Sequence, residues 1–298
     1  MVAFRMPPEG ADMPTQTTMN SATAWSPDVT VFAARDAIPD ALLFQATNVV
    51  TQELQGDSPV ARIPYVDDAE ASFVPEGEAI PQADPELAEI TVPTRAVGKL
   101  LKISREQWGQ EQAANMLSES TQRAITKAAN AALLTIEPSG GNPLRGLLET
   151  EGMLQGETIE THLDPLAELV GQIEDNYGQA DVILTSGSTW AAVRKLKVGE
   201  DRNDSLVGAG VEAGDRRLLG IPVLTSPSVP AGQLVVIDQH AVPSAVSGVQ
   251  VDTSEDYFFD SYSIALRAHF RFGWRVQHAD RLGVVPVALD DGDNGDGS

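Results

Sequence analysis

Residues 263–277 read Ser-Ile-Ala-Leu-Arg-Ala-His-Phe-Arg-Phe-Gly-Trp-Arg-Val-Gln, which is the clearest strand pattern in the sequence. Apolar and polar side chains alternate along it with a period of two. The apolar set is Ile264, Leu266, Ala268, Phe270, Phe272, Trp274 and Val276. The opposite set is Ser263, Ala265, Arg267, His269, Arg271, Arg275 and Gln277. Such alternation predicts a long, half-buried antiparallel strand.

A long helix is predicted upstream, over residues 111–136. Its apolar positions recur at helical spacing. They are Leu117, Ala124, Ala128 and Ala132, flanked by Met116, Ile125, Leu133 and Leu134. Ser104 and Gln107 form a capping-box pattern ahead of it, and Pro138 with Gly140-Gly141 ends it. At 1.5 Å per residue the helix would be about 38 Å long.

Residues 60–103 are predicted to form an extended hairpin. Residues 60–66 and 88–103 have strand composition, and the segment 73–81 between them is rich in Pro, Gly and Glu. A two-stranded hairpin is marginal alone, so it should lie on another surface.

The remaining elements are shorter and mixed. Asp164 and Pro165 begin a helix over 164–177, and Ser188 is expected to cap another helix that runs to Leu196. Short buried strands are expected at 182–185, 221–224 and 234–237, and a mobile Gly-rich loop at 199–217. Because strands and helices do not alternate regularly, the pattern indicates an α+β fold.

The first 40 residues carry Pro7, Pro8, Pro14, Pro27 and Pro39 and few apolar clusters. Such a segment buries too little surface to offset its ordering entropy. We expect an extended arm that contacts neighbouring subunits; a disordered tail is the alternative.

Composition restricts the function. The 298 residues carry a net charge of −23 and no cysteine, which argues against nucleic-acid or anionic-membrane binding and excludes thiolate chemistry. No apolar run reaches the roughly 18 residues of a membrane helix. The N-terminus lacks the apolar core of a signal sequence. We therefore expect folding and assembly in cytoplasm.

No catalytic or cofactor site is predicted. The four histidines have no zinc-type spacing, and the glycines of 208–214 do not follow a buried strand. Residues 291–296 resemble a calcium loop but lack its later ligands, so a solvated acidic tail is preferred. Acidic pairs such as Asp67-Asp68 lie in a segment without an apparent pocket. The sequence therefore predicts a protein that is not an enzyme.

Four stretches together resemble the major capsid proteins of tailed bacteriophages, which have the Hong Kong 97-type fold. They are residues 73–77 with the return strand to 106, residues 133–148, residues 180–197 with Leu219-Gly-Ile-Pro-Val223, and the strand pair of 252–276 with Arg281-Leu-Gly-Val-Val285. The resemblance spans about residues 45–288.

The resemblance implies a division of the chain, and its boundaries are expectations. The N-terminal arm takes 1–45, the peripheral domain 46–59, 104–155 with the spine helix, and 251–277 with the long strands. The E-loop takes 60–103. The axial domain takes 156–250 and ends, with the acidic tail, in 278–298.

The resemblance also implies function and partners. Copies would form hexamers and pentamers of an icosahedral shell around double-stranded DNA, without sequence-specific DNA binding or membrane contact. The protein would reside in the virion, after assembly in the host cytoplasm. A portal protein is implied and a decoration protein is allowed. An encapsulin-type nanocompartment is the alternative, and an enzyme of unknown type a more distant one.

Two departures from the family pattern refine these expectations. The E-loop begins near residue 60, which leaves no room for a fused scaffolding domain, so a separate scaffolding protein is implied. Residues 63–98 contain no Lys, and 261–275 contain neither Asn nor Glu. The covalent crosslink of some members should therefore be absent.

The hairpin carries eight acidic residues, which repel one another. They are Asp67, Asp68, Glu70, Glu76, Glu78, Asp84, Glu86 and Glu89. We expect Arg267 and Arg271 of a neighbouring subunit to receive carboxylates of Glu76, Glu78, Asp84 and Glu86. The alternative is that these arginines pair within their own subunit or face the DNA.

Overall fold

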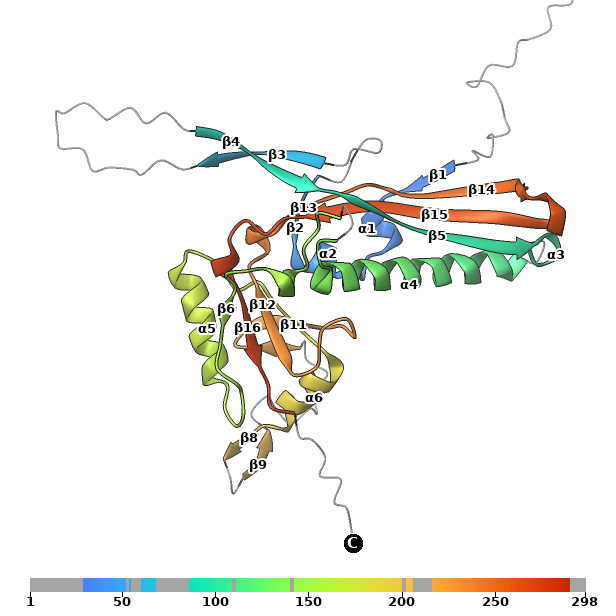
Figure 1. The fold of residues 1–298 in the computed structure, drawn as a ribbon. Coiled ribbons are helices and arrows are strands. Elements are labelled where there is room, and N and C mark those ends of the chain that lie inside the picture. The colour runs from blue at the N-terminus through green and yellow to red at the C-terminus, as the bar shows by residue number, and fades with distance from the viewer. Residues whose placement is uncertain are drawn as a thin grey trace, which may run out of the picture.

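The structure is a computed structural model, and it describes residues 29–51, 54, 60–67, 86–108, 111–139, 142–199, 202–205 and 216–289. Two units make up the described chain. The first is an elongated sheet with a long helix along one face, and the second is a smaller sheet flanked by two helices (Figure 1). This mixture of strands and helices agrees with the predicted α+β class.

The sheet of the first unit has six strands. Its order is β1–β14–β15–β13–β2, and β5 also pairs with β15. The strands are β1 Val29–Phe32, β2 Asn48–Thr51, β5 Arg95–Ser104, β13 Pro243–Val246, β14 Val249–Phe258 and β15 Ser263–Trp274. The short helix η3 (Phe259–Ser261) joins β14 to β15.

The alternation predicted for 263–277 is present in β15. Its even-numbered residues from Ile264 to Trp274 are each at most 7% exposed. Three aromatic rings stack in sequence along this face. The ring centroids of Phe270 and Phe272 lie 4.9 Å apart, and those of Phe272 and Trp274 lie 5.8 Å apart. The indole N–H of Trp274 donates to the carbonyl of Arg145 at 2.9 Å, so the buried ring leaves no donor unsatisfied.

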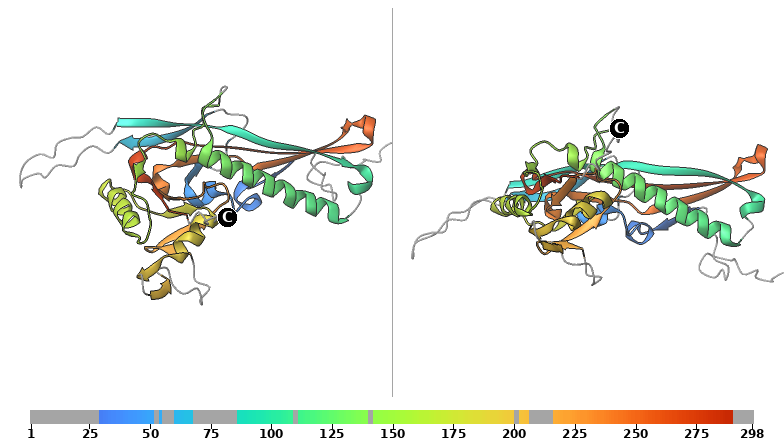
Figure 2. Two further views of the ribbon diagram at one scale, coloured as in Figure 1. Left: turned by 60° about the horizontal axis from the view of Figure 1, so that its bottom comes forward. Right: turned by 90° about the horizontal axis from the view of Figure 1, so that it is seen from below.

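The predicted long helix is α4, Glu111–Thr135, preceded by the short helix α3, Arg105–Trp108. It runs beside β5 and β15 in all three views (Figures 1 and 2). Its buried stripe recurs every four residues: Thr121, Ile125, Ala129 and Leu133. The predicted stripe, through Ala124 and Ala128, was one residue too early. Ala128 is exposed, because the larger Ile125 and Leu133 point into the core.

Part of the segment predicted to be an N-terminal arm belongs to the body of the molecule. Strand β1 pairs with β14, and the helices α1 (Ala34–Ala37) and α2 (Leu42–Ala46) enter the core. Ile38, Leu42 and Leu43 are at most 3% exposed. The assignment of 29–45 to an arm is therefore corrected, whereas residues 1–28 lie outside the described residues. Helix α2 has no side-chain cap of its own. Its first N–H donates to the Asn130 side chain of α4, at 2.8 Å.

The predicted hairpin ends earlier than expected. Strands β3 (Val60–Asp67) and β4 (Glu86–Pro93) pair with each other in a separate two-stranded ribbon. After Thr94 the chain enters β5, which pairs with β15 over ten residues. Residues 95–103 therefore belong to the sheet of the first unit and not to the hairpin. At the crossing, a Cβ on Gly273 would lie 1.9 Å from the Pro93 carbonyl oxygen, so only glycine fits there.

The second unit is a six-stranded sheet with the order β10–β11–β7–β12–β16–β6. The strands are β6 Leu154–Gln155, β7 Val182–Thr185, β10 Arg217–Leu218, β11 Ile221–Thr225, β12 Gln233–Ile237 and β16 Leu282–Pro286. The helices α5 (Asp164–Asp175) and α6 (Gly187–Lys195) pack against one face. Strands β8 (Lys197–Gly199) and β9 (Arg202–Ser205) form a small separate hairpin.

Three local predictions in this part of the chain are corrected. Ser186, not Ser188, caps α6: its hydroxyl accepts from the Thr189 N–H at 3.2 Å. Asp164 is the first residue of α5 and not its N-cap. Residues 243–250 were assigned to the axial domain, but β13 and the start of β14 pair within the first sheet.

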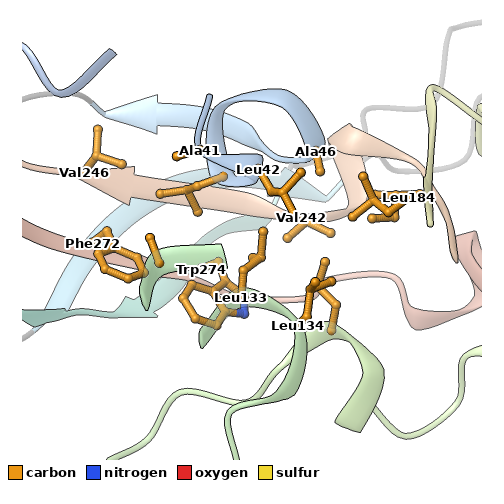
Figure 3. Close-up of a cluster of buried hydrophobic side chains, with 14 of the residues drawn as sticks. Ala41, Leu42, Ala46, Leu133, Leu134, Leu184, Val242, Val246, Phe272 and Trp274 are labelled. Atoms are coloured by element: carbon orange, nitrogen blue, oxygen red, sulfur yellow. The ribbon is translucent and has the colours of Figure 1, made fainter. Parts of the chain in front are cut away.

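The two units share one core (Figure 3). Along β7, β12 and β16 the side chains alternate between two apolar clusters. One set of side chains joins the larger cluster with residues of the first unit; this set includes Leu184, Val235 and Val284. The residues next to them in each strand, such as Ile183 and Val236, pack under α5 and α6. The short helices η1 (Leu147–Glu149), η2 (Gln239–Ala241) and η4 (Ala279–Arg281) lie in the connections.

Candidate functional site

The β3–β4 ribbon is anchored to the body at its base. Ala61, Ile63 and Val92 are buried against Ala245 of β13, in a small apolar cluster of their own. Beyond this base, the described parts of β3 and β4 run away from the body (Figures 1 and 2). The ion pair between Arg62 and Glu89 is 3.4 Å long and more than half exposed on both sides, so it adds little stability.

Most of the acidic residues predicted to contact a neighbour lie beyond this base. Glu76, Glu78 and Asp84 are outside the described residues. Glu86 begins β4, with Asp67 as its partner in the ladder. Their contact with arginines of a second copy stays a prediction.

Arg267 has a carboxylate partner in its own chain. Its guanidinium donates twice to one oxygen of Asp252, at 2.6 and 2.9 Å, and the Asp252 side chain is only 16% exposed. The same oxygen lies 3.7 Å from Nδ1 of His269. Asp252 is opposite Arg267 in the ladder between β14 and β15, which explains the pairing. Arg267 therefore has a carboxylate partner within its own chain, and its contact with a neighbouring copy stays a prediction.

Arg271 lies in a different setting, on the wall of a groove of about 940 Å³. The groove runs between the β4–β5 crossing, the loop after α4 and the end of β15. Four arginines line it: Arg95, Arg145, Arg271 and Arg275. On a chain with a net charge of −23, this concentration of cations forms a local basic surface.

Three of these arginines donate hydrogen bonds to groups of their own chain. Arg271 donates to the carbonyl and the hydroxyl of Thr94, at 3.3 and 3.2 Å. Arg275 donates to the Thr91 carbonyl at 3.3 Å. Arg145 pairs with the exposed carboxylate of Glu151 at 2.8 Å. Guanidinium groups oriented in this way can donate hydrogen bonds to carboxylates or phosphates.

The sequence indicated only part of this groove. The alternation of 263–277 placed Arg271 and Arg275 on one strand face. Arg95 and Arg145 arrive from two other segments, and only the tertiary fold brings them together. No local spacing marks such a site.

Neither a metal-binding cluster nor a membrane span is present in the described part of the chain. Among its residues, no three His, Asp or Glu side chains gather in a way that could hold a metal ion. No helix within the described ranges combines the length and apolarity needed to span a bilayer.

Comparisons with known proteins add an independent line of observation. A family model described as "Phage capsid family" matches residues 41–286. Comparison with curated proteins gives no match. Similar solved structures include the capsid of an empty GTA particle, with a TM-score of 0.63 and 19% identity over 84% of this chain and 90% of that one.

Two phage structures are similar to the same degree. The structure from Mycobacterium phage Adephagia has a TM-score of 0.63 at 14% identity, covering 84% of this chain and 90% of its own. The structure from Gordonia phage Cozz has a TM-score of 0.62 at 15% identity, covering 97% of this chain and 100% of its own. At these identities the similarity shows a shared fold.

Proposed function

Because the chain belongs to the phage capsid family, we propose that its copies form the hexamers and pentamers of an icosahedral shell around the double-stranded DNA of a tailed phage. A capsid protein is a structural component of the virion. The single observation that carries the proposal is the family match over residues 41–286, which covers the second unit up to the end of β16 and all of the first unit except β1 and α1. The similarity to solved capsid structures supports it at the level of the fold.

Within this proposal, each described element has a role. The β3–β4 ribbon would serve as the E-loop, α4 as the spine helix of a peripheral domain, and the second unit as the axial domain. Residues 1–28 would form the arm. The first unit supports such a role physically, because a helix of about 38 Å lies along β5 and β15, and β14 extends the same sheet.

The acidic hairpin is proposed to contact a neighbouring copy. Carboxylates such as Glu76 and Glu78 would bind basic groups of the next subunit, with Arg271 and its groove as the first candidate. What supports this is charge complementarity between an acidic segment and a groove lined by four arginines. Arg267 is a weaker candidate, because its guanidinium is already paired with the carboxylate of Asp252 in its own chain.

The charge balance bears on what the shell encloses. A wall whose copies each carry −23 gains little energy from releasing phosphate counterions. The wall would therefore attract DNA only weakly, and we propose that it encloses DNA without sequence-specific binding. A separate scaffolding protein, a portal protein and assembly in the host cytoplasm belong to the same proposal.

The test is assembly of the full chain. It would be expressed in bacteria, and the lysate fractionated on a density gradient and imaged by negative-stain microscopy. We expect closed particles of uniform size that resolve into six-fold and five-fold capsomers. Because a separate scaffolding protein belongs to the proposal, five-fold and six-fold capsomers without closed particles would still agree with it, whereas a chain that forms neither over a wide range of protein and salt concentrations contradicts it. Packaged enzyme in place of nucleic acid in particles from infected cells would favour a nanocompartment.

A further inference from the structure

Three residues other than glycine have a left-handed backbone in the described part of the chain. They are Tyr177, Leu219 and Tyr262, with φ of 57°, 50° and 47°. L residues avoid this region, and those that do enter it are mostly Asn or Asp. All three residues here are bulky, and they are 92%, 52% and 68% exposed, respectively. An unfavourable backbone that carries an exposed apolar side chain calls for a reason outside the subunit's own packing.

Tyr177 shows the mismatch most clearly. It follows α5 in a Schellman turn: the Gly178 N–H donates to the Ile173 carbonyl at 2.9 Å, and the Tyr177 N–H to the Glu174 carbonyl at 3.0 Å. The left-handed position of this turn is normally glycine. The rest of the turn is fixed, because Arg281 Nε donates to the Asn176 carbonyl at 3.0 Å. The tyrosine is thus presented outward on a rigid support.

Leu219 repeats the pattern in a different kind of turn. Residues 219 and 220 form the two-residue loop between β10 and β11, in which Leu218 pairs with Ile221. Both loop residues have positive φ, 50° at Leu219 and 83° at Gly220. This is the geometry of a type I′ turn, for which Asn-Gly is the preferred sequence. Leucine at the first position is unfavourable for the turn, and it is half exposed.

Tyr262 is different, because its own chain explains it in part. The Arg105 guanidinium lies 5.3 Å from the centre of its ring. Tyr177 and Leu219 are therefore the two positions that call for a partner outside the subunit.

The two turns lie near opposite edges of the sheet of the second unit. Leu219 is at the β10 edge. Tyr177 lies near the opposite edge, which is formed by β6. The Asn176 side chain donates to the carbonyl of Asp280, just before β16, and β16 pairs with β6. A closed ring of identical subunits needs two different surfaces on each copy, one for each neighbour. Opposite flanks of the second unit satisfy this requirement.

We propose that Tyr177 and Leu219 are contact residues on the two sides of a head-to-tail interface between copies of this chain. The inference rests on the proposed shell function and names the flanks through which the second units meet. Each bulky side chain is retained at a left-handed position because it is buried against a second copy.

The experiment exploits turn chemistry. Tyr177→Asn and Leu219→Asn each remove the bulky group and supply a residue that suits the turn. We expect each variant to keep its melting temperature or gain about 2 °C as a dissociated subunit. We expect the critical concentration for assembly to rise about tenfold or more, as for loss of a central interface side chain. Tyr177→Phe, which keeps the ring, should assemble like the unaltered chain.

A second readout uses the absence of cysteine from the sequence. Single variants Tyr177→Cys and Leu219→Cys should react with a maleimide in dissociated subunits and be protected in particles. If the unaltered chain never assembles, the shell proposal fails and takes this inference with it. If particles form, but the Asn variants assemble at the same concentration and the cysteines react equally in both states, this inference alone is overturned.

Discussion

Gly273 offers a direct test of how the ribbon leaves the body. In Gly273→Ala the new Cβ would lie 1.9 Å from the carbonyl oxygen of Pro93 and 2.8 Å from its carbonyl carbon. A carbon and a carbonyl oxygen in contact are about 3.3 Å apart, so the two backbones must separate by about 1.4 Å. The clash is with backbone on both sides, and side-chain rotation cannot relieve it.

The expected loss of stability is about 3 kcal/mol or more, at the upper end of what overpacking costs. At about 2–4 °C per kcal/mol, the melting temperature should fall by roughly 6–12 °C. The measurement is thermal unfolding of the dissociated subunit by circular dichroism. Because the shifted backbone is the crossing from β4 to β5, the ribbon should also change direction, and assembly should fail even below the melting temperature.

Gly171→Ala is the matched control. Gly171 lies within α5, and an added Cβ there meets nothing within 4 Å. Alanine is the better helix residue, so this variant should gain about 0.5–1 kcal/mol. If Gly273→Ala unfolds within about 2 °C of the unaltered chain, close backbone approach does not restrict position 273 and the reasoning is refuted.

Three further predictions concern other parts of the fold. Deleting residues 1–28 should leave a folded subunit that fails to assemble. Deleting residues 1–40 should also lower the melting temperature, because it removes the core side chains of Ala34 and Ile38. Equal melting curves for the two deletions would contradict this. Replacing Asn130 by Leu leaves the first N–H of α2 without its acceptor, so the free energy of unfolding measured in urea should fall by about 1–3 kcal/mol. An unchanged urea midpoint would contradict this. Arg271→Glu should weaken assembly and reduce its salt dependence. Arg123→Glu, which reverses an exposed charge on α4, is the control and should do so less. Identical salt titrations of both variants would exclude the groove as the hairpin's partner.

The sequence predicted best where one element carries its own periodic signal. The alternation along 263–277 and the 25-residue helix α4 were both long enough to be recognised locally. The face of α4 was misjudged because alanines recur at several helical spacings in it. The buried Thr121 and Asn130 obscured the true stripe.

What the sequence could not show depends on distant partners. Helices α1 and α2 have four and five residues, too few for a periodic pattern, and their burial depends on α4 and β13. The basic groove could not be predicted for the same reason, since Arg95 and Arg145 lie far from Arg271 in the chain. The left-handed backbone at Tyr177 and Leu219 could not be predicted from the sequence either, because bulky residues do not indicate such a conformation.

The core shared by the two units has a mechanical consequence. Six aliphatic side chains of the second sheet face the first unit: Val182, Leu184, Val235, Ile237, Leu282 and Val284. Rotating one unit against the other would expose them to water, at roughly 9–18 kcal/mol for the set. Thermal motion therefore does not separate the two units at this junction. A container built from such inflexible tiles must set its curvature at the seams between tiles, so a change in its diameter would appear as altered seam angles around an almost unchanged tile.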